Sequence, residues 1–408
     1  MPGAVAENGA AVPDALAPPP RHPRFPLLDG MRAIAVLSVL VVHVAVLARL
    51  GTTPAARLLT HLNVGVTIFF LISGFLLYRP FIAHRAGGAE APALPDYARR
   101  RLLRIVPAYW VVLTVLTLLP GTTGVSGGEW AGQYSLTFTL PFAQADGGGC
   151  LGNIDCGLAQ TWSLVVEFTF YAALPLWFLL SERLARGRST RAWVSLELAL
   201  LAGLSAASVL VHFGGTQGSV LNTYAGGSVL GFVVWFALGM GLAIVSVALG
   251  DRRPRAIELI GRFPAVPWLA ALVAYAILCA SVPATPYVID GSQQLAVHLV
   301  FGLVALLLML PAVFADDAGG LPRALLRHPV VAWIGLVSYG VFLWHYVIAL
   351  ELGGQGENLT FWPLLGVTVV LSLAVAAISY YAVERPLLRF KYRRTPPPAI
   401  EADARPSV

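Results

Sequence analysis

The chain has 408 residues, of which 57% are hydrophobic and 12% are charged, and its mean hydropathy is +0.74. A soluble domain carries about 25% charged residues, so this composition excludes an ordinary soluble protein. The net charge is +6. Because the basic residues flank apolar segments, we expect a lipid bilayer as a partner and no nucleic acid.

The two ends of the chain differ from its middle. Residues 1–24 are rich in Pro, Ala and Gly and lack the continuous apolar stretch of a cleaved signal peptide. We therefore expect a disordered tail over 1–24, one transmembrane domain over 25–394 and a second disordered tail over 395–408.

Ten apolar segments lie between the tails, each near the length of about 20 residues that a membrane-crossing helix needs. They are residues 33–50, 63–82, 103–119, 163–180, 192–212, 227–249, 265–283, 293–315, 330–350 and 361–383. This pattern predicts an all-α fold, a polytopic bundle of about ten transmembrane helices.

The basic residues predict how the bundle is oriented. With the N-terminus and the C-terminus cytoplasmic, 25 of the 27 Lys and Arg residues fall in inner segments, and only Arg49 and Arg57 lie outside. The strong preference for Arg over Lys is typical of a GC-rich bacterial genome. We therefore expect a multi-pass protein of a bacterial cytoplasmic (inner) membrane.

The longest predicted outer loop, residues 120–161, contains Cys150 and Cys156. The outside of a bacterial membrane is oxidising, which favours a disulfide. Two free thiols remain an equal alternative.

Three ionisable residues fall inside predicted spans, where such groups are costly and mark functional sites. Helical rise places His43, His345 and Glu167 roughly 16, 18 and 22 Å from the inner surface of a core about 30 Å thick. They therefore share one layer. Ser163, Glu167 and Tyr171 also share one helix face. A structural His–Glu hydrogen bond and a proton relay both remain alternatives.

A cluster of arginines, Arg99, Arg100, Arg101 and Arg104, precedes the third span. Such residues anchor the inner end of a helix. Arginine forks also suit phosphates, and Arg101 and Arg104 share one face. With Arg32, they are candidates for an anion-binding site.

The motifs around these residues resemble those of acyltransferase family 3, membrane proteins that include O-antigen, Nod-factor and macrolide acyltransferases. The resemblance covers roughly residues 25–390. It rests on LDGMRAIAV at 28–36 with His43, GVTIFFLISGF at 65–75, RLLRIVPAY at 101–109, Trp162-Ser163-Leu164 with Glu167, Ser338-Tyr339 with Leu343-Trp344-His345, and Val383-Glu384-Arg385-Pro386. Phe168 departs from the second acid that often follows Glu167 in the family.

The resemblance implies transfer of an acyl group, with acetyl-CoA as the expected acyl-CoA donor, to a hydroxyl of a glycan, glycolipid or glycosylated metabolite. No metal is expected. We interpret His43 as general base, with Glu167 or His345 fixing its tautomer. A covalent acyl-histidine intermediate is the alternative route. Residues expected to bind acyl-CoA are Arg32, Arg100, Arg101 and Arg104, and those expected to bind the acceptor are Trp162, Ser163 and Tyr171.

A transporter with a His–Glu proton relay is the alternative function. The resemblance further implies the single-domain form, without the C-terminal hydrolase-like domain that some members carry. Glu384 is expected to pair with a cytoplasmic arginine. Asp29 is expected to cap or orient the first helix near Arg32, with positioning of that arginine as the alternative.

Overall fold

The structure is a computed structural model that describes residues 26–51, 53–118, 130–137, 158–213, 228–250, 252–283, 290–314, 320–354 and 360–391. The predicted tails at 1–24 and 395–408, and the loop that carries Cys150 and Cys156, lie outside these residues.

Helices make up the regular structure of the described residues, which contain no strand. In chain order they are α1 (Pro26–Leu47), α2 (Pro54–Thr60), η2 (His61–Asn63), α3 (Val64–Arg85), α4 (Leu94–Leu118), α5 (Trp130–Tyr134), η5 (Ala159–Thr161), α6 (Trp162–Ala185), α7 (Thr190–Phe213), α9 (Val229–Leu249), α10 (Arg255–Arg262), α11 (Ala265–Ser281), α12 (Gly291–Phe314), α13 (Leu321–Arg327), α14 (Pro329–Gly354), α15 (Phe361–Ser379), η7 (Tyr380–Glu384), α16 (Arg385–Leu388) and η8 (Arg389–Lys391).

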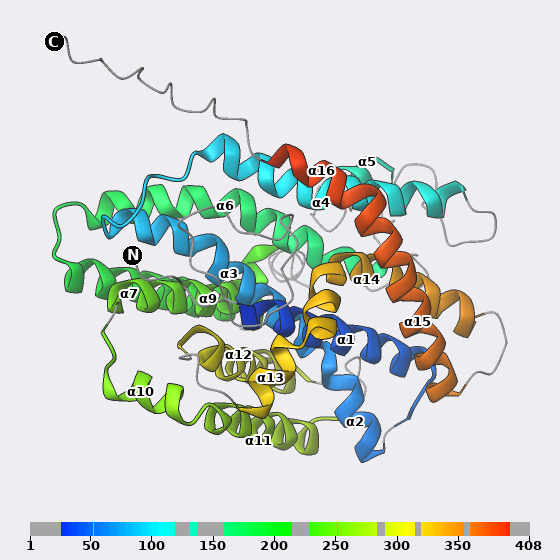
Figure 1. Cartoon of the computed structure of the whole chain (residues 1–408). Coiled ribbons are helices and arrows are strands. Elements are labelled where there is room, and N and C mark those ends of the chain that lie inside the picture. The colour runs from blue at the N-terminus through cyan, green and yellow to red at the C-terminus, as the bar shows by residue number, and fades with distance from the viewer. Residues whose placement is uncertain are drawn as a thin grey trace, which may run out of the picture.

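Nine helical segments within the described ranges are long and apolar enough to cross a membrane. A tenth crossing is obtained if α10 and α11, which meet at a bend of 82°, count as one span. The long helices run side by side in Figure 1. The prediction of an all-α membrane bundle is therefore confirmed.

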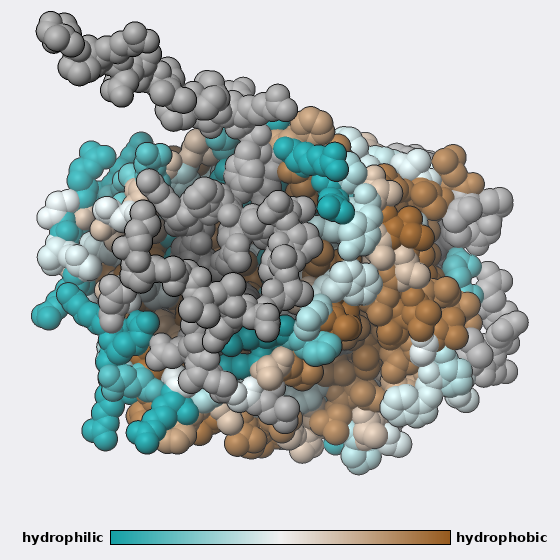
Figure 2. Space-filling model, in the orientation of Figure 1, coloured by the Kyte–Doolittle hydropathy of each residue, from teal (hydrophilic) through white to brown (hydrophobic). Residues whose placement is uncertain are grey.

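The surface of the bundle carries many large apolar side chains, as a lipid-facing surface requires. Leu118, Leu210 and Trp362 are 75%, 69% and 73% exposed. In Figure 2 a brown apolar surface occupies the right of the view, and hydrophilic residues gather at the left end. In Figure 1 the connections α3–α4, α6–α7 and α9–α10 turn at that same end.

Two helix boundaries differ from the sequence-based expectation. The third span begins at Leu94, well before residue 103, so the arginines at 99–104 lie inside α4. This first part of α4 carries Asp96 and the arginines, whose charged groups reach water at the membrane surface. It was missed because the search used apolar segments, and this part of the helix is not apolar. The seventh span, α11, has only 17 residues.

The helix α1 lies in the middle of the bundle and packs against α3, α14 and α15. Two glycines permit its close approach to α3 and α14. A Cβ atom at Gly65 of α3 would overlap the carbonyl oxygen of Ala35, and one at Gly335 of α14 would overlap that of Asp29. Small residues at helix crossings are the usual means of packing helices in membranes. These contacts fix the height at which α1 presents Arg32 and His43.

Candidate functional site

The two histidines predicted to share a layer form a direct contact. Nδ1 of His43 on α1 lies 2.8 Å from Nε2 of His345 on α14. His345 is fully buried, whereas His43 keeps part of its surface exposed. The sequence left open whether Glu167 or His345 contacts His43, and the structure places His345 there.

The hydrogen bonds of His345 determine which nitrogen of His43 is basic. Nδ1 of His345 lies 2.9 Å from the carbonyl oxygen of Val341, which only accepts hydrogen bonds, so this nitrogen donates. With both rings neutral, Nε2 of His345 accepts a hydrogen bond from Nδ1 of His43. The remaining nitrogen of His43, Nε2, then carries a lone pair in place of a proton, as a general base requires.

Aromatic and aliphatic side chains surround the histidine pair. The ring of Tyr346 meets the ring of His43 edge-on, with centroids 5.0 Å apart. An apolar cluster that includes Leu40, Val44 and Val341 packs around this part of α1 and α14. The pair therefore lies in a low-dielectric environment with His345 holding the orientation of His43.

A separate cavity of about 130 Å³ lies between α1, α3, α4, α6 and α14, and the ring of Phe342, one of its lining residues, lies 6.2 Å from that of His345. Apolar cavities of about 150 Å³ bind a molecule the size of benzene, so this one has room for a small organic group. Its polar lining consists of Arg32, Ser73, Arg101, Arg104, Ser163, Glu167, Tyr171, Ser338 and Tyr339. Neither His43 nor His345 is among its lining residues.

Three arginines give the cavity its positive charge. Arg32 lies 3.1 Å from Asp29, one turn earlier on α1, and its side chain is 18% exposed. This contact agrees with the alternative that Asp29 positions Arg32, whereas Asp29 itself lies inside α1 and does not cap it. Arg101 and Arg104, on one face of α4, both line the cavity, and the guanidinium of Arg101 lies over the ring of Tyr171 at 5.7 Å. Such contacts with an aromatic face hold a cation in place.

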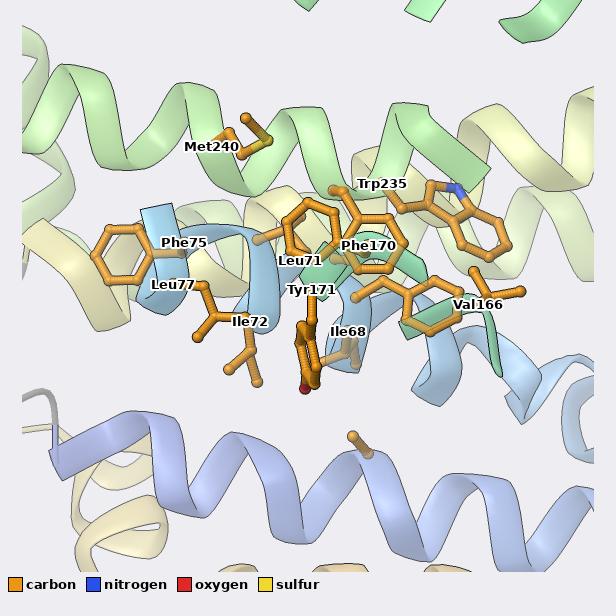
Figure 3. Packing of buried hydrophobic residues seen from close by; sticks show 14 of the residues in the cluster. Ile68, Leu71, Ile72, Phe75, Leu77, Val166, Phe170, Tyr171, Trp235 and Met240 are labelled. Carbon is orange, nitrogen blue, oxygen red and sulfur yellow. The ribbon is translucent and has the colours of Figure 1, made fainter. Parts of the chain in front are cut away.

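Glu167 belongs to the cavity and not to the histidine pair. The hydroxyl groups of Ser73 on α3 and Tyr171 on α6 both donate to its Oε1 atom. Figure 3 shows the Tyr171 hydroxyl pointing away from the apolar side chains of Leu71, Phe170 and Trp235. Glu167 therefore places one negative charge beside the three arginines.

Tyrosines and a glutamine hold the helices around the cavity in position. Tyr97 donates to the carbonyl oxygen of Tyr171 at 3.1 Å and ties α4 to α6. Tyr339 donates to that of Ile105 at 2.8 Å and ties α14 to α4. Gln160 in η5 donates its amide to the carbonyl oxygen of Leu343 on α14 at 3.0 Å. These bonds satisfy buried polar groups while fixing the cavity walls.

Two predicted site residues lie away from the cavity lining. Arg100 is half-buried on α4 and does not line the cavity, because the helix turns its side chain away from Arg101 and Arg104. Trp162 does not line it either, and its ring packs 5.1 Å from that of Phe232 on α9. Ser163 and Tyr171, the other residues predicted to bind the acceptor, do line it.

Glu384 ends the short π-helical turn η7 and is 6% exposed. Its carboxylate interacts electrostatically with Arg104. No ion pair of Glu384 is found among the described residues, so its pairing with an arginine stays a prediction. Single π-turns often occur at functional sites, and this one packs against α4, the helix that carries the arginines.

A buried ion pair outside the cavity was not predicted from the sequence. Arg85 of α3 pairs with Glu197 of α7, and their side chains are 7% and 1% exposed. Tyr78 also donates to Glu197, and Arg85 donates to Ser181 of α6 at 2.8 Å. Because Glu197 lies in an apolar stretch of α7, its charge inside a span was the available signal. The cluster joins three helices outside the cavity.

Comparison with known proteins identifies the family of the chain. Residues 25–381 match the family model described as an acyltransferase domain. The chain belongs to acyltransferase family 3. The histidine pair and the arginine-lined cavity lie inside the matched residues.

Curated relatives of this acyltransferase come from several bacteria. A candidate peptidoglycan O-acetyltransferase of Bacillus subtilis, YrhL, is 27% identical over 90% of this chain and 55% of the relative. Acyltransferase MdmB of Streptomyces mycarofaciens is 26% identical over 93% of this chain and 95% of the relative. Exopolysaccharide production protein ExoZ of Rhizobium meliloti is 26% identical over 80% of this chain and 89% of the relative. The chain thus spans about half of YrhL and nearly all of MdmB. No solved structure matches it significantly.

Proposed function

We propose that this protein is an integral membrane O-acyltransferase that moves a short acyl group from acyl-CoA to a hydroxyl of a sugar-containing acceptor. The observation that carries the proposal is the position of the His43–His345 pair beside a cavity lined by Arg32, Arg101 and Arg104. Acyl transfer from a donor that carries phosphates requires a base for the acceptor hydroxyl and, near it, a site that binds the phosphates.

The donor binds through its phosphates and its thioester arm. Arginine forks bind phosphate oxygens in pairs, and three of them meet at the cavity. The cavity volume suits the thioester end of the donor rather than its nucleotide. We therefore place the phosphates at the arginines, on the partly exposed side of Arg32, and the acyl end inside the cavity.

The transfer step is a direct displacement in this proposal. Nε2 of His43 removes the proton of the acceptor hydroxyl as its oxygen attacks the thioester carbonyl carbon. The carbon–sulfur bond breaks, and the thiolate of CoA leaves and takes up the proton from His43. The products are an O-acyl ester and free CoA. His345 acts as a positioning residue, because it holds Nδ1 of His43 protonated.

Glu167 has a different role from His345 in this proposal. It holds Ser73 and Tyr171 by hydrogen bonds and balances part of the arginine charge. The hydroxyl protons of Ser73 and Tyr171 are thus already donated to Glu167, and Ser163 donates to the carbonyl oxygen of Gln160 at 3.2 Å. These three hydroxyls orient the lining of the cavity.

Both ends of the chain lie in the cytoplasm in this proposal, in the cytoplasmic membrane of a bacterium. The support is the basic-residue pattern together with the hydrophilic end of the bundle in Figure 2, where the inner connections turn. Arg32 lies near the start of α1, and Arg101 and Arg104 lie in the first half of α4. The basic-residue pattern assigns the starts of both helices to the cytoplasmic side. Cytoplasmic acyl-CoA then reaches these arginines directly.

The acceptor is a sugar hydroxyl. The support comes from the relatives, whose printed names include peptidoglycan O-acetyltransferase and exopolysaccharide production protein. A peptidoglycan fragment and an alkyl glucoside are therefore suitable probes.

The test uses the full chain, purified into nanodiscs, with radiolabelled acetyl-CoA and these two acceptors. We expect the label to move to the acceptor and free CoA to appear in equal amount. A transporter with a His–Glu relay would instead move substrate across proteoliposomes and leave acetyl-CoA intact, which would contradict the proposal.

A further inference from the structure

The cavity and the histidine pair are adjacent compartments with a narrow border. Each is surrounded by its own apolar cluster, and Phe69 of α3 and Phe342 of α14 are the two phenylalanines that pack against both clusters. Both also line the cavity. Aromatic side chains therefore separate the arginine-lined cavity from the histidine pair.

Phe342 is the border residue nearest to the histidines. It precedes His345 by three residues on α14, so the two side chains lie on one face of the helix. Their ring centroids are 6.2 Å apart. Phe342 is only half-buried although it lies in the interior of the bundle, because part of its surface faces the cavity. Its ring thus forms the wall between the cavity and His345.

The backbone beneath this ring is held in place. The side-chain amide of Gln160 donates to the carbonyl oxygens of Leu343 at 3.0 Å and Phe342 at 3.5 Å. Gln160 is itself 3% exposed. Because the helix cannot shift easily at this point, rotation of the Phe342 side chain, and not movement of α14, opens the wall on this side.

We infer that Phe342 sets the length of the acyl group that this protein transfers, and that it restricts the donor to short acyl chains. The inference rests on the proposed function. An acyl group that enters from the arginines meets the Phe342 ring where its carbonyl must approach His43. A two-carbon group fits beside the rotated ring, whereas a longer chain needs the volume that the ring occupies. Cavity walls of this kind discriminate by one or a few methylene groups.

The test compares acetyl-CoA, butyryl-CoA and hexanoyl-CoA with the full chain in nanodiscs, by release of free CoA in the presence of the acceptor probes. For the wild-type protein we expect kcat/KM to fall steeply from acetyl to hexanoyl. Phe342→Ala should raise the hexanoyl-to-acetyl ratio at least roughly tenfold. Phe342→Leu should raise it less, and Phe342→Trp should lower the butyryl-to-acetyl ratio.

Phe168→Ala is the matched control. Phe168 is a half-buried phenylalanine of α6 that does not line the cavity, so its truncation should leave the ratios unchanged. If Phe342→Ala does not fold, the inference is still tested by the rise of the hexanoyl-to-acetyl ratio in Phe342→Leu and the fall of the butyryl-to-acetyl ratio in Phe342→Trp.

Turnover of acetyl-CoA with unchanged ratios in all Phe342 variants would overturn this inference alone. A wild-type protein that turns over none of the three donors would contradict the proposed function, and this inference with it. The two failures are therefore distinguishable.

Discussion

His345 lies with its Nε2 atom 2.8 Å from Nδ1 of His43, while its own Nδ1 atom is committed to the carbonyl oxygen of Val341. One helix turn of α14 thereby fixes the tautomer of a side chain on α1. This is the relationship between orienting group and base that catalytic triads use, with a neutral imidazole in place of a carboxylate.

Removal of His345 should slow the chemical step and spare donor binding. We expect His345→Leu to lower kcat roughly 100-fold or more and to leave KM for acyl-CoA within a factor of two. His345→Gln keeps an oxygen that accepts a hydrogen bond, so it should retain more activity than His345→Leu. Steady-state kinetics in nanodiscs measure kcat and KM separately. Equal losses in kcat and in donor affinity would show that His345 only supports the fold.

The arginines of α4 should act on the donor. Arg101→Ala and Arg104→Ala each remove a charged hydrogen-bond donor from the cavity, so we expect KM for acetyl-CoA to rise roughly 10- to 100-fold. Arg99→Ala is the control, since Arg99 is an arginine of the same helix that does not line the cavity. Titration with acetyl-CoA measures the effect. An equal change in KM for all three variants would show that the arginines only anchor the helix at the membrane surface.

Glu167→Gln distinguishes two candidate bases. The amide oxygen of Gln still accepts hydrogen bonds from Ser73 and Tyr171, but the variant has no carboxylate to take up a proton. If His43 is the base, this variant should keep a measurable kcat and change chiefly KM for the donor. A loss of kcat as large as that of a His43 variant would assign the proton transfer to Glu167.

The buried Arg85–Glu197 pair should affect stability. Glu197→Ala leaves the Arg85 guanidinium buried beside α7 without this carboxylate, and breaking such a pair costs about 3–5 kcal/mol. We expect a lower Tm of the detergent-solubilised protein. The double variant Arg85→Met with Glu197→Leu removes both charges and should recover most of the loss. A double variant less stable than Glu197→Ala would contradict this view of the pair.

The sequence predicted the architecture because apolar length and basic-residue placement are strong local signals. The ten segments correspond to the nine long helices and the bent pair α10–α11 within the described part of the chain. Arg101 and Arg104 were also paired correctly, since helical spacing alone puts them on one face.

The arrangement of the site was less accessible from the sequence. Depth along a helix placed His43, His345 and Glu167 in one layer, but depth says nothing of which helices are neighbours. In the structure α1 packs against α14, which joins the histidines, whereas Glu167 contacts α3 through Ser73. Phe342 and Gln160 carried no signal, because a phenylalanine in an apolar span and an amide at a helix start are ordinary residues there.

The most direct test of the account is the single-turnover rate of acyl transfer by His43→Ala in nanodiscs, measured beside its affinity for acetyl-CoA. We predict that the variant stays folded and monodisperse and keeps its affinity for acetyl-CoA, while the transfer rate falls at least roughly 100-fold. A transfer rate equal to that of the wild-type protein would show that the lone pair on Nε2 of His43 takes no part in the reaction.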